Sequence, residues 1–474
     1  MFDGPIRDYA YWTPRAPAVL TSHLTVSYAE FDADIDRFGA AVAALGVVRG
    51  CGVVSLAIRS PYIQLLGLVA LARLGVVSSP AADAADLCLT DAEGPSAPGL
   101  ARLDAAWVTA MFAAEPRPLP RLESEPGELA RVMLSSGTTA RPRRVPFDGR
   151  RIDADKLANL RVYGAGAAGT WIPQTGVDSL LGFSMAVLGW SQGVAVANGL
   201  PLAPLPALME TAATGLVGLT PSHLRALLGA LPDGFQPRPG WRVSVAGASL
   251  PEGIAREAAL RLTPDIRRQY GATESSQIAA GCAARGGAPG EVGVTPSGAI
   301  VQIIDDAGHP LPDDQSGEIR VRGERTAAGY LDDAQATVDR FRDGWFHTND
   351  IGRRLPDGTI VVEGRRDDRM ILGGGQKFMP AGLEDAAAAC PGVLDCAAFA
   401  VPDAADLDVC WLAVVADEGF DRDNLAQHLA AYPDLVPNRF AWIDEIPRNA
   451  MGKIERVRLR EALLAALAAS ASGG

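Results

Sequence analysis

The spacing of apolar and polar positions changes past the middle of the chain. In the first part, residues 26–45 place apolar side chains at helical intervals, and residues 61–74 form an apolar helix that begins with Pro61. Short apolar runs at 52–58 and 76–80 predict buried strands. Because helices alternate with strands here, this part predicts parallel sheets whose faces are covered by helices.

From about residue 286, short apolar runs alternate with Gly, Pro and Asp turns, which is typical of antiparallel strands. A charged and then glycine-rich stretch after residue 363 predicts a hinge. The rest predicts helices at 381–389 and 422–431, and strands at 393–401, at 410–416 and around Ala441.

These patterns predict an α/β fold in two domains. The large N-terminal domain spans residues 1–364 and contains parallel α/β sheets plus a β-rich subdomain at about 286–363. A small, mobile α+β C-terminal domain spans residues 365–474. Residues 90–127 are rich in Pro, Ala, Gly and Glu, so we expect an irregular connection there with one helix near 101–114.

Composition and charge exclude several functional classes. The 474 residues carry 43 basic and 56 acidic side chains, a net charge of −13, which argues against a broad nucleic-acid surface but not against a local anion site. The six cysteines form no CxxC pair and only five histidines are present, so we expect no zinc site, no disulfide framework and a cytoplasmic setting. The uncharged stretch between Asp178 and Glu210 could span a membrane, but its Gly, Asn, Gln and Pro residues favour a buried helix and strand.

A segment rich in Ser, Thr and Gly follows the predicted strand that ends at Leu134. Small hydroxyl residues around a glycine allow backbone N–H and side-chain OH groups to wrap phosphate oxygens, and the arginines that follow add positive charge. The segment is not a Walker loop, because GxxxxGK[ST] is absent. A basic Ser/Thr-rich turn without a ligand is the alternative. The candidate phosphate-binding residues are Ser135, Ser136, Gly137, Thr138, Thr139 and Arg143.

Two further segments carry polar groups that suit a nucleotide. In the run that extends from Gln269 to Glu274, Tyr offers a flat face for a base, Thr can contact a phosphate and Glu can hold Mg²⁺. In the run from Gly344 to Asp350, the final carboxylate can accept both hydroxyls of a ribose. Alone, each run also fits an ordinary turn, the second with a solvated capping Asp.

Five blocks in this order resemble the adenylate-forming superfamily, which includes acyl-CoA synthetases, acyl-AMP ligases and the adenylation domains of peptide synthetases. The three segments above are followed by a block from Gly364 to Glu384 and by a block from Pro447 to Arg456 that contains Lys453. The run VAGASL at 245–250 is similar to the family's GGAPL. The resemblance covers roughly residues 20–460.

The resemblance implies an enzyme that binds ATP, Mg²⁺ and a carboxylic acid and forms an acyl-adenylate with release of pyrophosphate. A thiol, either of CoA or of a phosphopantetheine, would then displace AMP. Catalytic roles would fall to Lys453, Thr273 and Glu274, with Glu274 as the Mg²⁺ ligand, and the hinge would lie near Asp367. Besides the phosphate-binding candidates, the implied ATP- and AMP-binding residues are Gly247, Ala248, Ser249, Gln269, Tyr270, Gly271, Ala272, Thr273, Asp350 and Arg365.

The scarcity of lysine supports the implied role of Lys453. Only three of the 43 basic residues are lysines, Lys156, Lys377 and Lys453. A compact ammonium can contact oxygens of the carboxylate, the α-phosphate and the pyrophosphate at once, a geometry that a planar guanidinium matches poorly. A lysine therefore stands where the chemistry favours one.

The substrate-side residues follow from the resemblance alone. Asp178 lies near the position at which amino-acid adenylating members bind an ammonium group, although a capping Asp is the alternative. Lys377 could meet CoA phosphates, although a solvated loop lysine is the alternative. The implied acyl pocket includes Pro173, Gln174, Asp178, Gly247 and Ser275, and the implied thiol side includes Gly374, Gly375 and Lys377.

The phosphate loop departs from the family pattern. Ala140 and Arg144 stand where the family has Gly and could stiffen the loop, whereas Arg143 stands where it has Lys and keeps the charge. Asn349 replaces the Gly before Asp350, and we expect the turn to survive because Asn tolerates left-handed backbone.

The hinge block is one residue longer than usual, so either Arg365 or Arg366 could contact the ribose. Arg365 directly follows Gly364, as the family pattern requires, and is preferred.

We therefore expect an ATP-dependent acid–thiol ligase that forms an acyl-CoA through an acyl-AMP. The alternatives are an enzyme that loads an acyl or amino-acyl group onto a carrier protein or another nucleophile, and a non-catalytic ATP-binding member. The expected partner is a carboxylic acid, and the carrier-loading alternative adds a carrier protein. Neither nucleic acid nor a membrane span is expected.

Overall fold

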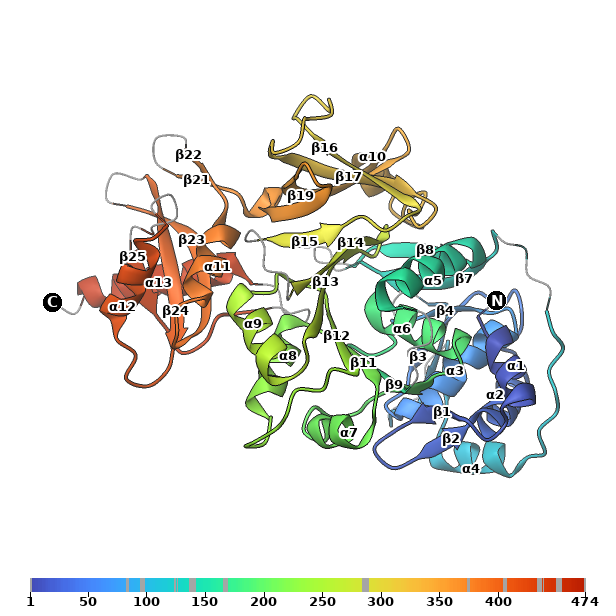
Figure 1. Cartoon of the computed structure of the whole chain (residues 1–474). Coiled ribbons are helices and arrows are strands. Elements are labelled where there is room, and N and C mark those ends of the chain that lie inside the picture. The colour runs from blue at the N-terminus through green and yellow to red at the C-terminus, as the bar shows by residue number, and fades with distance from the viewer. Residues whose placement is uncertain are drawn as a thin grey trace.

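The chain folds into a large α/β body and a small α+β body, which lies at the left of Figure 1. The computed structural model describes residues 2–81, 85–93, 99–122, 125, 127–135, 142–164, 169–283, 290–372, 376–403, 407–432, 437, 439–448 and 454–472.

A six-stranded sheet near the N-terminus has the strand order β6-β5-β3-β4-β7-β8 and is parallel except for the hairpin of β7 and β8. Its strands are β3 (Val53–Ala57), β4 (Val77–Ser79), β5 (Leu87–Thr90), β6 (Leu100–Arg102), β7 (Leu129–Leu134) and β8 (Arg144–Asp148). β6 lies in the stretch that was expected to be irregular apart from one helix.

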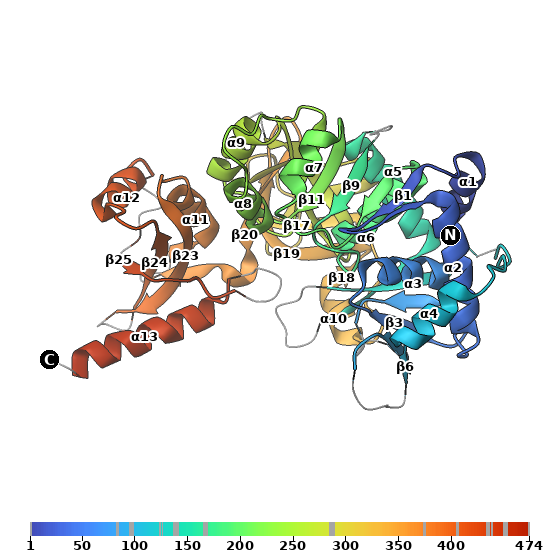
Figure 2. The same cartoon turned by 90° about the horizontal axis from the view of Figure 1, so that it is seen from below.

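Helices cover this sheet, with α3 against β3 and β4, and α2 against α3 and α4 (Figure 2). They are α1 (Gly4–Trp12), α2 (Tyr28–Ala43), α3 (Pro61–Arg73) and α4 (Ala105–Ala113). α2 begins with a capping box in which Ser27 and Glu30 satisfy each other's backbone N–H groups, and α3 begins with Pro61 after the capping hydroxyl of Ser60. The helices predicted at 26–45 and 61–74 are thus present.

A second sheet begins as a parallel α/β sheet, in the order β1-β10-β9-β11-β12-β13, with β2 antiparallel at its edge. Its strands are β1 (Pro17–Leu20), β2 (Thr25–Ser27), β9 (Thr170–Pro173), β10 (Ala195–Ala197), β11 (Gly215–Leu219), β12 (Trp241–Val245) and β13 (Asp265–Ala272). Its helices are α5 (Gly149–Tyr163), α6 (Leu180–Ser191), α7 (Leu205–Thr211), α8 (Pro221–Gly229) and α9 (Glu252–Arg261).

The β-rich part continues this second sheet, because β13 pairs with β14 in antiparallel fashion and the pairing runs on through β15, β20, β19, β17 and β16. Its elements are β14 (Ser276–Cys282), β15 (Glu291–Val294), β16 (Ala299–Ile304), β17 (Gly317–Gly323), α10 (Ala334–Arg340), β18 (Phe341–Arg342), β19 (Trp345–Arg354) and β20 (Thr359–Arg365). Antiparallel pairing therefore begins at β14, about ten residues before the predicted start of the subdomain.

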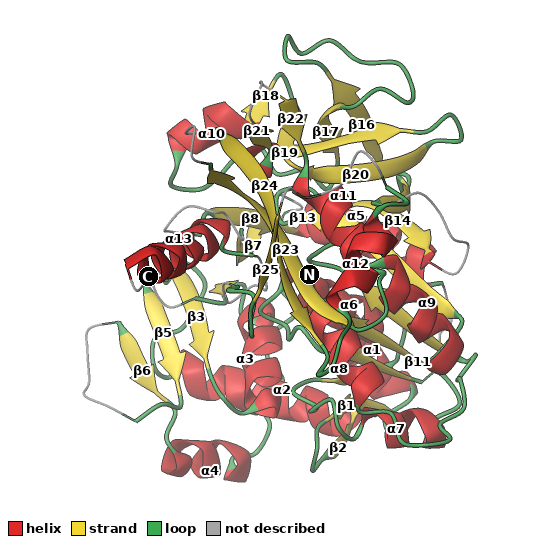
Figure 3. Ribbon diagram, turned by 90° about the vertical axis from the view of Figure 1, so that its left-hand side faces the viewer, coloured by secondary structure: helices red, strands yellow, loops and turns green. Residues whose placement is uncertain are grey.

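The small body, which faces the viewer in Figure 3, has its own sheet in the order β23-β24-β25. Its elements are η3 (Arg366–Asp368), β21 (Met370–Leu372), β22 (Gln376–Phe378), α11 (Pro380–Ala388), β23 (Val393–Pro402), β24 (Asp408–Ala416), α12 (Arg422–Leu429), β25 (Arg439–Trp442) and α13 (Arg456–Ser472). The predicted helices and strands of this part are all present, and α13 is an additional helix that was not predicted.

The uncharged stretch between Asp178 and Glu210 forms α6, β10 and most of α7, and the side chains of α6 between residues 182 and 190 are buried. The predicted buried helix and strand are therefore confirmed. Among the described residues, no helix is both long and apolar enough to cross a membrane.

Candidate active site

Two side chains that were predicted to surround a nucleotide hold the carboxylate of Asp350, on β19. Tyr270, on β13, donates its hydroxyl to Asp350 Oδ2 at 2.6 Å, and Nε of Arg365, on β20, lies 3.4 Å from Oδ1. Burial, followed by the charge of Asp350, raises the pKa of Tyr270, so its hydroxyl stays protonated and donates. The structure thus brings together three residues from separate sequence blocks.

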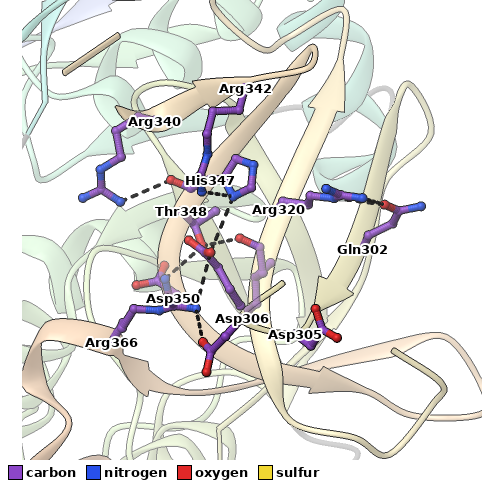
Figure 4. A network of polar contacts seen from close by, with 12 residues as sticks. Gln302, Asp305, Asp306, Arg320, Arg340, Arg342, His347, Thr348, Asp350 and Arg366 are labelled. Atoms are coloured by element: carbon purple, nitrogen blue, oxygen red, sulfur yellow. Dashed lines mark hydrogen bonds and ion pairs between the residues drawn. The ribbon is translucent and has the colours of Figure 1, made fainter. Parts of the chain in front are cut away.

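Arg366 contacts a different pair of carboxylates. Its Nη2 lies 3.4 Å from Glu318 Oε2 and 3.3 Å from Asp306 Oδ1 (Figure 4). Because Arg365 is the arginine that faces Asp350, the structure favours Arg365 on the ribose side. Arg366 instead links the start of the small body to β17 and to the turn after β16.

Sequence reasoning assigned no role to the buried pair of Glu318 and His347. His347 Nδ1 lies 2.8 Å from Arg342 Nη2 and 3.5 Å from Glu318 Oε2 (Figure 4). Burial alone would raise the pKa of Glu318, but the contacts with His347 and Arg366 outweigh it, and the pKa lies below its ordinary value. His347 falls within the run from Gly344 to Asp350, yet that motif does not reveal that Glu318 and His347 join β17 to β19 next to Asp350.

The Thr273 turn lies against the end of the strand that leads into the Ser/Thr-rich segment. Thr273 Oγ1 donates to the carbonyl of Leu134 at 3.4 Å. The backbone N–H of Ser135 donates to the carbonyl of Arg143 at 2.9 Å and so joins the two ends of the segment. Residues 136–141, and with them Ser136, Gly137, Thr138, Thr139 and Ala140, lie outside the described residues.

Two hydroxyls next to this contact are buried without a hydrogen-bond partner. Ser135 is 4% exposed and Ser275 is 1% exposed, and neither Oγ has a partner within the part of the chain that the structure describes. Buried polar atoms are normally paired, and exceptions in native proteins are often functional. Their position fits a ligand that brings its own hydrogen-bonding oxygens, as a nucleotide phosphate does.

Glu274 is 8% exposed, and Tyr330 donates its hydroxyl to Glu274 Oε1 at 2.7 Å. The guanidinium of Arg143 lies over the ring of Tyr330, 5.3 Å from its centre, and its Nε lies 3.5 Å from Asp333 Oδ2. The candidate Mg²⁺ ligand and the loop arginine therefore share Tyr330 as a neighbour. Within the described ranges, no group of three His, Cys, Asp or Glu side chains is arranged to hold a metal ion.

Arg151, for which the sequence predicted no role, also supports the turn at Thr273. Its guanidinium donates to the carbonyls of Thr273, Pro146 and Arg325 and stacks on the ring of Phe147, 3.7 Å from the ring centre. Burial lowers its pKa to about 9, which leaves it charged at neutral pH. An arginine in the first turn of a helix gives no sequence signal for this role.

Gln269 lies on β13, and residues 247–249 form a loop after the neighbouring strand β12. The Gln269 amide donates to the hydroxyls of Tyr163, at 2.7 Å, and Ser244. Gly247 has a φ of +94°, a conformation that favours glycine. Ser249 Oγ reaches across to the small body and donates to Asp385 Oδ1 at 3.4 Å. Gly247 and Ala248 are exposed beside this contact, and Gly271 and Ala272 form the end of β13.

Asp178 is engaged with the protein itself. Its Oδ2 accepts a hydrogen bond from the Gln64 amide at 2.8 Å, and its Oδ1 lies 3.8 Å from Nη2 of the fully buried Arg131. Because Asp178 balances this arginine, the structure argues against it as the partner of a substrate ammonium group. Pro173 ends β9, and the Gln174 amide donates to the carbonyl of Leu200 at 3.0 Å.

The hinge residue Asp367 lies in η3, where its Oδ2 accepts a hydrogen bond from the Asn349 amide at 2.6 Å. Asn349 has a φ of +65°, so the expected left-handed turn is present. The backbone of Lys377 lies in β22. Gly374, Gly375 and Lys453 lie outside the described residues.

Comparison with known proteins identifies the class of protein as an AMP-binding ligase. The AMP-binding enzyme family matches residues 82–331, and the AMP-binding enzyme C-terminal domain matches residues 382–453. The chain belongs to the AMP-binding enzyme family. The predicted superfamily, fold class and enzyme class are confirmed.

Curated relatives include a sulfoacetate–CoA ligase of Cupriavidus necator, 30% identical over 73% of this chain and 69% of its own length. A 3-hydroxybenzoate–CoA ligase of Aromatoleum sp. is 27% identical over 95% of this chain and 94% of its own.

Among solved structures, ATP-bound MatB from Rhodopseudomonas palustris superposes with a TM-score of 0.83 at 22% identity, over 98% of this chain and 99% of its own. MenE, an O-succinylbenzoate coenzyme A synthetase from Bacillus subtilis, determined with ATP and magnesium, superposes with a TM-score of 0.81 at 20% identity, over 96% and 98%.

Proposed function

We propose that this protein converts a carboxylic acid into its CoA thioester in two steps. In the first, a carboxylate oxygen attacks the α-phosphorus of ATP, the bond from that phosphorus to the bridging oxygen breaks, and pyrophosphate leaves. In the second, the thiolate of CoA attacks the carbonyl carbon of the acyl-adenylate and AMP leaves. The observation that supports this most directly is the grouping of Tyr270, Asp350 and Arg365 on neighbouring strands of one sheet.

On the nucleoside side, Asp350 accepts the two ribose hydroxyls, since a carboxylate has two oxygens that can each accept more than one hydrogen bond. Arg365 balances the charge of this carboxylate and helps to orient it. The hydrogen bond from Tyr270 fixes the direction of the phenol ring, which then offers a stable face to adenine.

On the phosphate side, the hydroxyl of Ser135 donates to phosphate oxygens, and that of Thr273 would turn from the carbonyl of Leu134 to do the same. Lys453 donates to the oxygens on which charge develops between carboxylate and α-phosphate. Glu274, oriented by Tyr330, would hold Mg²⁺. When bound there, the cation neutralises phosphate charge. Because the described residues supply one carboxylate at this point, phosphate oxygens and water would complete its coordination.

CoA is the acyl acceptor that we propose, because the curated relatives above are CoA ligases and one of them aligns over 95% of this chain. The thiol of a carrier-bound phosphopantetheine is the second candidate and would undergo the same chemistry. We further propose that residues 365–474 move as the small domain about Asp367, with Gly374, Gly375 and Lys377 on the thiol side.

The test is acid-dependent pyrophosphate release from ATP over a panel of aryl, dicarboxylic and sulfonated acids, with and without CoA. We expect release with at least one class of acid, and formation of the thioester and AMP when CoA is present. Lys453→Ala should lower adenylation on the order of 1000-fold with folding intact.

Lys156→Ala is the matched control, since the partly buried Lys156 pairs with Asp153 at 2.6 Å and has no proposed role in the site, and it should keep full activity. Thioester formation with pantetheine-loaded carrier protein but not with CoA would transfer the proposal to the second acceptor. Near-normal activity of the Lys453 variant, or no release with any acid, would refute the proposal.

A further inference from the structure

Two arginine–carboxylate pairs hold the ends of the segment 449–453, which contains Lys453 and itself lies outside the described residues. Arg448 and Ile454 pair as an isolated antiparallel bridge, and the backbone N–H of Glu455 donates to the carbonyl of Pro447 at 2.9 Å. The two ends of the segment are therefore joined to each other.

The first end is attached to β23. Arg448 Nη2 donates to Asp395 Oδ1 at 2.8 Å, and its Nε donates to Oδ2 at 3.3 Å. This bidentate pair is about one-third exposed on each side, so solvent weakens it.

The second end is attached more firmly, by Arg456 at the start of α13. Its Nη1 donates to Glu384 Oε1 at 2.5 Å and to the carbonyl of Ala398 at 2.6 Å, and its Nη2 donates to Glu384 Oε2 at 3.2 Å. Glu384 Oε1 also accepts the backbone N–H of Ala398 at 2.8 Å. The side chains of Arg456 and Glu384 are 18% and 14% exposed, so this pair is better shielded than that of Arg448.

Arg456 also reaches the hinge. Its Nε lies 3.9 Å from Oδ1 of Asp368, the residue after Asp367 in η3. One guanidinium therefore connects α11, β23, the hinge turn and the segment that follows Lys453. Ile454 directly follows Lys453 in the sequence.

We propose that Arg456, held by Glu384, is a positioning residue for the adenylation step. This inference rests on the proposed function, in which Lys453 acts during adenylation. The pair fixes the backbone of residues 454–456 against α11 and β23, and this restricts where the ammonium of Lys453 can lie. A misplacement of about 1 Å at a reacting group can reduce a rate on the order of 100-fold.

The prediction separates two half-reactions. Arg456→Gln should lower the kcat of acid-dependent pyrophosphate exchange on the order of 100-fold while leaving the KM for ATP nearly unchanged. The rate at which CoA consumes chemically prepared acyl-adenylate should stay close to that of the wild type. Arg456→Lys keeps the positive charge but lacks the planar set of N–H donors of a guanidinium, so it should recover only part of the exchange rate.

Arg458→Gln is the matched control, because Arg458 lies on the same helix, its side chain is 74% exposed, and it contacts Glu455 at 3.4 Å. It should leave both half-reactions unchanged. The double variant Arg456→Met with Glu384→Gln removes the charge from both partners and should regain stability, which thermal unfolding measures, without regaining exchange.

Equal losses in both half-reactions, recovery of exchange in the double variant, or normal exchange in Arg456→Gln would each overturn the proposal. Absence of exchange in the wild type would instead refute the proposed function, so the two failures are distinguishable.

Discussion

Asp385 provides a pH-dependent test of how the small body packs against the large one. It lies on α11, where Ser249 of the large body donates to its Oδ1 at 3.4 Å. Burial, and then the charge of Glu384, raise the pKa of Asp385 from 3.8 to about 7, while Arg268 acts in the opposite direction and Glu252 adds to the rise. The informative perturbation is Asp385→Asn, which mimics the protonated carboxyl group at every pH.

The sign follows from the raised pKa. The folded state binds the proton of Asp385 more tightly than the unfolded state, so this group favours folding at pH below 3.8 and progressively loses that contribution as pH rises to about 7. A shift of about three units corresponds to about 4 kcal/mol, since one unit is worth about 1.36 kcal/mol. Because the side chain keeps partial contact with solvent, we expect roughly half of this, about 2 kcal/mol.

Denaturant titrations at pH 5 and pH 8 measure this effect. The free energy of unfolding of Asp385→Asn should match that of the wild type more closely at pH 5 and exceed it at pH 8, with the difference growing by about 1–2 kcal/mol between the two. Glu418→Gln, in the exposed turn after β24, removes an acid from the same body without touching the contact, and it controls for net charge.

A difference between the Asp385 variant and the wild type that does not change with pH would refute the reasoning, because it would show that the carboxyl group titrates alike in the folded and unfolded states. A growing difference would show that the carboxyl group binds its proton more tightly in the folded than in the unfolded state.

Three further substitutions test the site. Tyr270→Phe removes the hydroxyl that donates to Asp350, so steady-state kinetics should show a severalfold higher KM for ATP, and an unchanged KM would contradict the assigned contact. Asn349→Gly keeps the left-handed turn but removes the hydrogen bond to Asp367, worth about 1 kcal/mol, so the ratio of the two half-reaction rates should change about fivefold. Asp178→Asn leaves a buried arginine without its counter-charge and should lower the unfolding midpoint without altering the preference between acids with and without an amino group, whereas a changed preference would restore the ammonium hypothesis.

The sequence predicted those parts of the fold that depend on local spacing. The apolar residues of α3 and α6 and the alternation of β16 to β20 are visible within short windows, and so are helix-starting signals such as Ser60 and Pro61. The continuity of the second sheet depends on which strands pair across long separations, which no local pattern specifies. The predicted subdomain boundary therefore fell after β14, although the antiparallel pairing already includes it.

The site shows the same division. Tyr270 and Asp350 belong to recognisable blocks, so the sequence alone predicts that they lie close together, as their hydrogen bond shows. Arg151 could not be anticipated, because the carbonyls that it binds belong to Thr273, 122 residues away, and Arg325, 174 residues away. Every residue has a backbone carbonyl, so a side chain that binds one cannot be recognised from the residue types in a single sequence.

This use of backbone acceptors also gives a physical meaning to the arginine excess. Arg131 donates to the carbonyl of Val177, Arg325 donates to those of Ser297 and Gln277, and Arg456 binds a carbonyl and a carboxylate together. A guanidinium has five donors in a rigid plane and can join several elements at once, whereas an ammonium presents its donors from a single point. The same difference explains why a lysine and not an arginine stands at position 453. In the proposed function, oxygens from separate reacting groups contact the single small charge of Lys453. The net charge of −13 does not indicate this role, because Arg131 and Arg325 are buried and act by joining elements of the fold.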